Sequence, residues 1–275
     1  MPVRARSWTE ADQAKMSGFR ERLPEHLYRY VGVRGRRLQR LEDIVVGSEL
    51  YFPAYSTMND PFEGAVPFDF AAEEREVREY WMDHLVETGQ GHDPQALARV
   101  EEFVAHRDDP AYHARWKAEI TDEAAGCGLS CFSETCTDIP MWAYSAEGHQ
   151  GVCLCFRTAL LFGPGWNGCF PPMPVTYEPD FPVVSFYRAS EFDRGLALLA
   201  TKSEAWRHER EWRIVRNTGA GAVRFDSSAL DGIVLGCKMQ PADQAAVQGI
   251  LARRSPPIQR LTARRDDRAY RLLAD

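Results

Sequence analysis

The chain has 275 residues, of which 44% are hydrophobic and 27% charged, and its formal net charge is −7. This balance is close to that of globular proteins, so it excludes wholesale disorder, and the length is ample for a buried core. An acidic chain has no general attraction for phosphate backbones, which disfavours a dedicated nucleic-acid binder. The basic group at Arg34, Arg36, Arg37 and Arg40 could still form a local contact patch, but a solvated helix face is the favoured interpretation.

No apolar run approaches the roughly 20 residues that a membrane helix needs. The first residues, MPVRARSWTEADQ, lack the hydrophobic stretch of a signal peptide. We therefore expect a cytoplasmic protein with no membrane partner. Seven cysteines, an odd number without a CxxC pair, fit reduced thiols in that compartment and disfavour structural zinc.

The first half of the chain predicts helices and short strands in alternation. A helix at 9–23 has Thr9 as its N-cap and Asp12 as a capping-box partner. Residues 71–126 are charged and helix-favouring, and they predict two or three inserted helices that start at Asp93-Pro94 and Asp109-Pro110. The other elements expected here are a strand at 26–33, a strand at 49–52, a loop at 53–64 and, between the two strands, a helix with Leu38, Leu41, Ile44 and Val45 on one face and Gly47 at its end.

The second half is richer in strand signals. Expected strands lie at 128–132, 151–156, 175–177, 211–215, 231–235, 258–262 and 270–273. Expected helices lie at 140–146, 190–207 and 241–253, with a Gly/Pro-rich loop at 163–174. There is no strict βαβ rhythm, no internal repeat and no phosphate-binding glycine motif. The sequence thus predicts a single α+β domain over 1–275, with the helical insertion at 71–126.

A strand rich in aromatic residues, LYRY, offers the first candidate site residue. Alternation along a strand puts Tyr28 and Tyr30 on one face and Arg29 on the other. If Arg29 faces a cleft, its planar guanidinium suits a phosphate or diphosphate. The alternative is a solvated arginine on an edge strand.

The loop at 56–63, STMNDPFE, has the composition of a turn. Asn59 and Asp60 are suited to capping backbone amides, which favours a structural role. Asp60 and Glu63 could instead contribute carboxylates to a metal site, although no histidine or third acid lies nearby in the sequence.

The segment CFSE and the short helix after it carry the next candidates. Ser133 comes where a strand ends, so its hydroxyl could point into a cleft. Trp142 and Tyr144 could form a stacking wall for a flat ring, or they could belong to the core. No GxSxG motif surrounds Ser133, so a hydrolase triad is not expected.

The segment EREWR has the most distinctive pattern. On an extended strand Glu209, Glu211 and Arg213 share one face. The opposite face then carries Arg210, Trp212 and Ile214. Two carboxylates about 7 Å apart repel each other by on the order of a kcal/mol. They are either an exposed pair balanced by Arg213, or a pair that binds a ribose and stabilises developing positive charge.

These segments together resemble a bacterial family known as the domain-of-unknown-function 2971 family. The stretches that carry the resemblance span residues 27 to about 239, and they are LYRY, FPAYSTMNDPFEG, LSCFSETCTDIPMWAYSAEGHQGVCLCF, KSEAWRHEREWRIV and GIVLGCKM. The combination is specific, but the resemblance implies little biochemistry.

The order of Arg29, Ser133 and Glu209-Arg210-Glu211 is similar to that in ADP-ribosyltransferases of the arginine–serine–glutamate type. That resemblance implies a mainly antiparallel sheet split into two packed halves, and NAD as substrate. It implies Glu211 as the catalytic carboxylate, with Glu209 orienting the acceptor. Arg29, Tyr30, Ser133, Trp142 and Tyr144 would then bind the nucleotide. The serine motif departs from the family because it lacks a Ser-Thr-Ser run.

Three functions are compatible with these patterns. The first is an NAD-dependent ADP-ribosyltransferase or NAD glycohydrolase, as in a toxin or phage-defence effector, with a protein, a nucleic acid or water as acceptor. The second is a metal-dependent hydrolase or nuclease that uses Asp60, Glu63 and the Glu209–Glu211 pair. The third is a non-enzymatic sensor or adaptor that uses the aromatic segments as an interaction surface.

Overall fold

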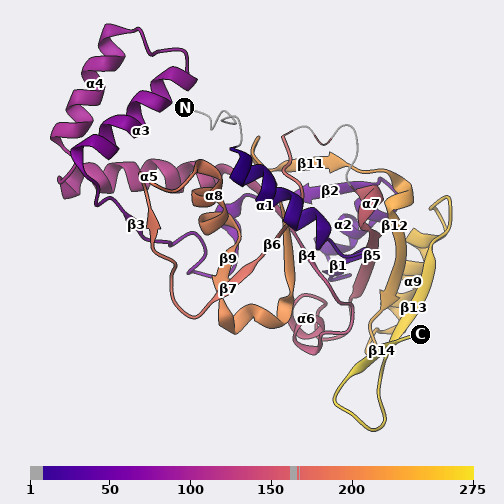
Figure 1. Cartoon of the computed structure of the whole chain (residues 1–275). Coiled ribbons are helices and arrows are strands. Elements are labelled where there is room, and N and C mark those ends of the chain that lie inside the picture. Colours follow the sequence, from indigo (N-terminus) through magenta and orange to yellow (C-terminus); the bar gives the residue numbers. More distant parts are fainter. Residues whose placement is uncertain (1–8, 162–165, 167) are drawn as a thin grey trace.

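An eight-stranded sheet with the order β14-β13-β12-β5-β1-β4-β10-β6 forms the centre of the computed structural model, which describes residues 9–161, 166 and 168–275 (Figure 1). Its strands are β1 (His26–Val31), β4 (Gly128–Ser133), β5 (Val152–Arg157), β6 (Met173–Pro174), β10 (Glu211–Arg216), β12 (Leu230–Leu235), β13 (Gln259–Arg265) and β14 (Leu272–Ala274). Neighbouring strands are antiparallel except β12 and β13, which are parallel. The predicted α+β class with a mainly antiparallel sheet is confirmed.

The strands β4, β5, β10 and β12 are buried along nearly their whole length because both faces of the sheet are covered. One face packs in a core that includes Leu27, Phe132, Leu154, Trp212 and Ile214. The helices α2 (Arg36–Val45) and α9 (Pro241–Leu251) contribute to that same core. The other face carries two smaller clusters, against α6 (Ile139–Tyr144) and α1 (Glu10–Glu21). Burial on both faces explains why these strands are hydrophobic without strict alternation.

The remaining strands, in the described residues, form three two-stranded sheets rather than a second packed half. They are β2 (Glu49–Phe52) with β11 (Gly221–Arg224), β3 (Phe68–Asp69) with β8 (Val184–Ser185), and β7 (Thr176–Glu178) with β9 (Thr201–Ser203). Leu50, Phe52 and Val223 of the first pair pack into the main core. The described strands therefore form one large sheet and three small ones, in place of the expected sheet split into two packed halves.

The segment at 71–126 forms three helices, as predicted: α3 (Glu74–Glu87), α4 (Pro94–Ala105) and α5 (Pro110–Gly126). Asp93 and Asp109 cap the last two through their side chains, with proline in the first turn of each. Figure 1 shows α3 and α4 projecting away from the main sheet. They share a core in which Trp81 stacks on Phe103, with ring centroids 4.1 Å apart.

Local signals set the other helix boundaries well, with one exception. Thr9 and Asp12 form the predicted capping box of α1. The helix expected at 190–207 is wrong, since α8 (Glu191–Leu199) ends early and is followed by β9 and the 3₁₀ helix η2 (Glu204–Glu209). Pairing of β9 with β7 replaces the helical hydrogen bonds there.

The other short elements are α7 (Thr158–Leu161), η1 (Tyr55–Thr57) and η3 (Ser227–Ala229). No helix in the described ranges combines the length and apolarity needed to cross a bilayer.

Candidate functional site

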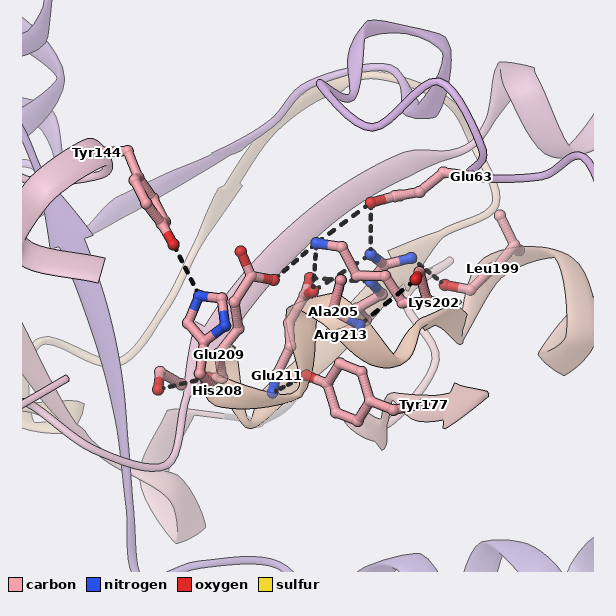
Figure 2. A network of polar contacts seen from close by, with 12 residues as sticks. Glu63, Tyr144, Tyr177, Leu199, Lys202, Ala205, His208, Glu209, Glu211 and Arg213 are labelled. Carbon is pink, nitrogen blue, oxygen red and sulfur yellow. Dashed lines mark hydrogen bonds and ion pairs between the residues drawn. The ribbon is translucent and has the colours of Figure 1, made fainter. Parts of the chain in front are cut away.

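Five charged side chains meet in the interior at the start of β10, and we call them the carboxylate cluster: Glu63, Lys202, Glu209, Glu211 and Arg213 (Figure 2). Lys202 is at the centre. Its Nζ lies 2.6 Å from Glu209 Oε2, 3.3 Å from Glu211 Oε2 and 3.4 Å from Glu63 Oε1. Arg213 donates from Nε to Glu211 Oε1 at 2.9 Å, and its guanidinium also lies 3.0 Å from Glu63 Oε1.

Two short elements bring the lysine and the glutamates together. Glu211 and Arg213 lie two residues apart on β10, so they share a face of the strand. Glu209 ends the 3₁₀ helix, and Arg210 follows it in the left-handed region at φ 44°. The two glutamates therefore reach Lys202 through a left-handed turn and not through strand alternation. The Ser133 hydroxyl holds this turn by donating to the Glu209 carbonyl at 2.7 Å.

Glu63 joins the cluster from a loop that is distant in sequence. Asp60 Oδ1 accepts from the Phe62 N–H at 2.9 Å, which confirms the predicted capping role of Asp60. Gly64 has φ 72°, and a Cβ there would approach the Tyr55 ring at 3.1 Å, so glycine suits this turn. The turn directs Glu63 inward, where its side chain is 2% exposed.

The cluster holds three carboxylates against two cations, so it has one excess negative charge when all five groups are ionised. Burial opposes ionisation of Glu211, but Arg213 and Lys202 outweigh it and lower the pKa of that carboxyl to about 2. Burial, with the neighbouring Glu211 carboxylate, raises the pKa of Glu209 despite the attraction of Lys202. Two adjacent carboxyls with pKa values pushed apart are typical of acid–base sites.

The two carboxyls also differ in access. Both oxygens of Glu211 are bonded by cations, and its side chain is 6% exposed. Glu209 is bonded to Lys202 through Oε2 and is 12% exposed. Figure 2 shows Glu209 on the outer side of the cluster, next to His208 and toward Tyr144. Glu209 is therefore the carboxyl better placed to meet a bound molecule.

Three rings border that outer side, and we call them the aromatic wall: Tyr144, Trp206 and His208. Tyr144 is 52% exposed, and its hydroxyl lies 2.8 Å from His208 Nε2. The Trp206 ring centroid is 6.4 Å from that of Tyr144 and 4.8 Å from Lys202 Nζ. The wall thus links an exposed aromatic surface directly to the buried lysine.

Arg29 is not brought together with Glu211. The register pairs Tyr28 with Ser133 and Ser133 with Glu211, so these three side chains share one face of the sheet. Arg29, the neighbour of Tyr28, points to the opposite face. There it donates to the Ser130 hydroxyl and lies over the Phe132 ring, and burial lowers the pKa of its guanidinium. The interpretation of Arg29 as a diphosphate ligand beside Glu211 is therefore wrong.

Tyr30, Ser133 and Trp142 have structural roles. Trp142 is fully buried and donates from Nε1 to the Cys136 carbonyl at 2.7 Å, so it cannot stack on a ligand. The Tyr30 hydroxyl donates to the Thr135 carbonyl at 2.8 Å, and its ring packs edge-on against Trp142. Ser133 is 1% exposed and lies beside Glu211, where it supports the turn described above. Among the three aromatic residues predicted to bind the nucleotide, Tyr30, Trp142 and Tyr144, only Tyr144 has an exposed ring.

The metal hypothesis required Asp60 and Glu63 to approach the Glu209–Glu211 pair. Glu63 shares Lys202 with that pair, whereas Asp60 caps the Phe62 N–H instead. The Lys202 ammonium, however, fills the space among the three carboxylates that a divalent ion would need. Both carboxylate oxygens of Glu211, which a metal ion would need as ligands, already accept hydrogen bonds from Arg213 and Lys202. This geometry favours acid–base chemistry over metal-assisted hydrolysis.

Sequence reasoning did not single out Lys202, Trp206 or His208. Lys202 opens the stretch KSEAWRHEREWRIV, but the interpretation of 190–207 as one helix concealed its position on a strand. A signal was present, because Ser203 before Glu204 is a typical N-cap and marks a new helical start.

The depressed pKa of Glu211 predicts an acid-dependent loss of stability. Since its folded pKa lies below the ordinary value near 4.3, its contribution is present above that pH and is lost as pH falls toward 2. Between pH 6 and pH 3 we expect wild-type protein to lose about 2 kcal/mol more unfolding free energy than a Glu211→Gln variant. Urea denaturation at both pH values measures this, and equal losses in the two proteins contradict the assignment.

Comparison with known proteins finds a similarity to one family model over residues 141–214 and no activity. No curated protein matches the chain, and no solved structure matches it. The matched family segment, residues 141–214, contains the aromatic wall and four members of the cluster, whereas Glu63 lies outside it. This match to the model described as "Protein of unknown function (DUF2971)" supports the resemblance to that family drawn from the sequence.

Proposed function

We propose that the chain is an NAD-consuming enzyme, either an NAD glycohydrolase or an ADP-ribosyltransferase, with Glu209 as its catalytic carboxylate. The observation that supports this is the contrast between two adjacent buried carboxyls: Glu209 is the more exposed at 12% and has a raised pKa, whereas Glu211 is 6% exposed and has a lowered pKa. Glycosidic bonds are commonly cleaved between carboxyls whose environments differ in this way.

The proposed chemistry gives the two glutamates roles opposite to those first expected. The bond between the nicotinamide nitrogen and the ribose breaks, and its electron pair leaves with nicotinamide. Ionised Glu209 stabilises the positive charge that develops on the ribose, and water or another acceptor adds there and releases a proton. Glu211 is a positioning residue, since it holds Lys202 and Arg213 and keeps the site charged.

The surroundings of Glu209 suit parts of such a substrate. Tyr144 and Trp206 present ring surfaces on which nicotinamide can stack, next to the carboxylate. Arg210 is exposed and directly follows Glu209 in the chain, and we assign it the diphosphate in place of Arg29. Its side chain makes no ion pair or hydrogen bond with other residues of the described ranges.

The wider biological proposal is that of a bacterial effector of the DUF2971 family that acts in the cytoplasm, as in a toxin or phage-defence system. The seven cysteines are all free, which is compatible with a reducing compartment. The acceptor is a protein, a nucleic acid or water.

The direct test is to incubate the full chain with NAD and to follow nicotinamide release by chromatography. We expect release that is lost in Glu209→Gln and kept in Glu204→Gln, a change to an exposed carboxylate of the same 3₁₀ helix. Absence of both nicotinamide release and NAD binding at millimolar concentration contradicts the proposal.

A further inference from the structure

A second candidate site lies at the other end of the main sheet. A cavity of about 550 Å³ opens between the end of β12, the start of α9 and β13. Its lining includes Gly236, Lys238, Gln244, Thr262, Arg264 and Arg265. Five strand positions separate β13 from β10, so at about 4.8 Å per strand the cavity is roughly 24 Å from the carboxylate cluster.

The topology of this region favours a ligand at this position. β12, α9 and β13 form a strand–helix–strand unit whose two strands are parallel. The cavity lies at the carboxyl end of β12, at Leu235 and Gly236, and beside the later residues of β13. Ligands of open sheets with parallel strands bind outside the carboxyl ends of those strands, because the connecting loops leave a crevice there.

The loop that closes the cavity is held rigidly. Gly236 donates its N–H to the Gly151 carbonyl, and Lys238 donates its backbone N–H to the His149 carbonyl, each at 2.9 Å. A Cβ at position 236 would meet the His149 carbonyl oxygen at 2.3 Å, so only glycine fits this close approach. The wall that carries Lys238 is therefore fixed before any ligand arrives, which lowers the entropic cost of binding.

Three cations and no carboxylate line the cavity. Arg264 is already paired, since its Nε lies 2.7 Å from Asp275 Oδ2. Lys238 and Arg265 are exposed, and their side chains make no ion pair or hydrogen bond with the rest of the described chain. Asp243 in the first turn of α9 is neutralised by Arg34 at 2.8 Å. Free positive charge thus concentrates at one place in a chain whose net charge is −7.

We propose that this cavity binds a small phosphate-bearing molecule, with Lys238 and Arg265 as its charged contacts. A volume of about 550 Å³ fits one molecule of nucleotide size. The Thr262 and Gln244 side chains that line it can add hydrogen bonds to phosphate oxygens. The acidic remainder of the chain disfavours a long nucleic acid, which would need an extended basic track. The site does not depend on the NAD chemistry proposed above.

Isothermal titration of the full chain with inorganic pyrophosphate tests the site. We expect saturable binding that weakens at least about tenfold in the double variant Lys238→Gln/Arg265→Gln. The matched control is Arg260→Gln, which removes an exposed arginine of the same strand that does not line the cavity. The control should bind within about twofold of wild type.

Parallel titrations with orthophosphate and with ADP identify the group that is recognised. Tighter binding of ADP than of pyrophosphate assigns a nucleotide, and equal binding assigns the diphosphate alone, and both outcomes support the site. Equal affinity of the double variant and wild type for pyrophosphate overturns the proposal. No binding of any of the three compounds at about 5 mM overturns it as well.

Discussion

Replacing Arg213 by leucine is expected to lower the free energy of unfolding by about 3–5 kcal/mol. The Arg213 side chain is fully buried. It donates hydrogen bonds to Glu211 and the Leu199 carbonyl, and it forms an ion pair with Glu63. Its removal leaves Lys202 alone to balance three buried carboxylates. An unpaired buried charge is costly because the interior cannot solvate it as water does. Chemical denaturation of wild type and variant at pH 7 measures the difference.

The control for Arg213→Leu is Arg207→Leu, since that arginine is largely exposed and should change stability by less than about 0.5 kcal/mol. The double variant Arg213→Leu/Glu211→Leu should recover part of the loss, because a buried pair replaced by apolar side chains is often tolerated. A single-variant loss under about 1 kcal/mol, or a double variant less stable than the single, contradicts the described cluster.

The parts of the fold that local signals encode were predictable from the sequence. The capping box of Thr9 and Asp12 and the Asp-Pro starts at 93 and 109 each fix a helix end through bonds within a few residues. The central strands were predictable from local composition as well, because strand segments are rich in β-branched and aromatic residues.

The predictions that were wrong concern features that depend on contacts between segments distant in the sequence. Strand alternation correctly separated Arg29 from Tyr28 and Tyr30, but the face that meets Glu211 is set by the register of β1, β4 and β10. A strand of three residues such as β9 is too short to show a period, so the pattern around Lys202 predicted a continued helix. Pairing between strands therefore determines both the position of Arg29 relative to Glu211 and the strand conformation at Lys202.

The candidate site was predictable in its residues and less so in its roles. The pair Glu209–Glu211 stood out in the sequence, yet the left-handed backbone at Arg210 has no local signal because it is not a glycine. That turn, with Lys202 and Glu63 arriving from elsewhere, encloses Glu211 and leaves Glu209 at the outer side. The proposed catalytic carboxylate therefore moves from Glu211 to Glu209.

Separate replacement of the two glutamates by glutamine distinguishes the catalytic residue from the residue that stabilises the cluster. Glu209→Gln is expected to lower kcat for nicotinamide release by about 10²–10⁴-fold, because a neutral amide cannot stabilise developing positive charge or accept a proton. Its effect on unfolding should be small, since the change removes the excess negative charge of the cluster and an amide oxygen can still accept from Lys202. Glu211→Gln should instead destabilise the fold, because it weakens the bonds of two buried cations. Steady-state kinetics and denaturation of both variants give the contrast.

The pH profile tests the same assignment independently. Activity requires ionised Glu209, whose pKa is raised by burial and by Glu211, so kcat/KM should begin to fall at a higher pH than an ordinary glutamate near 4.3 would give. The carboxyl is protonated below its own pKa, so activity is lost on the acid side and kept above it. If Glu211 were the catalytic group, its pKa of about 2 would leave the profile flat down to strongly acidic pH. A flat acid limb, or a Glu209→Gln variant with wild-type kcat, would therefore return the catalytic role to Glu211.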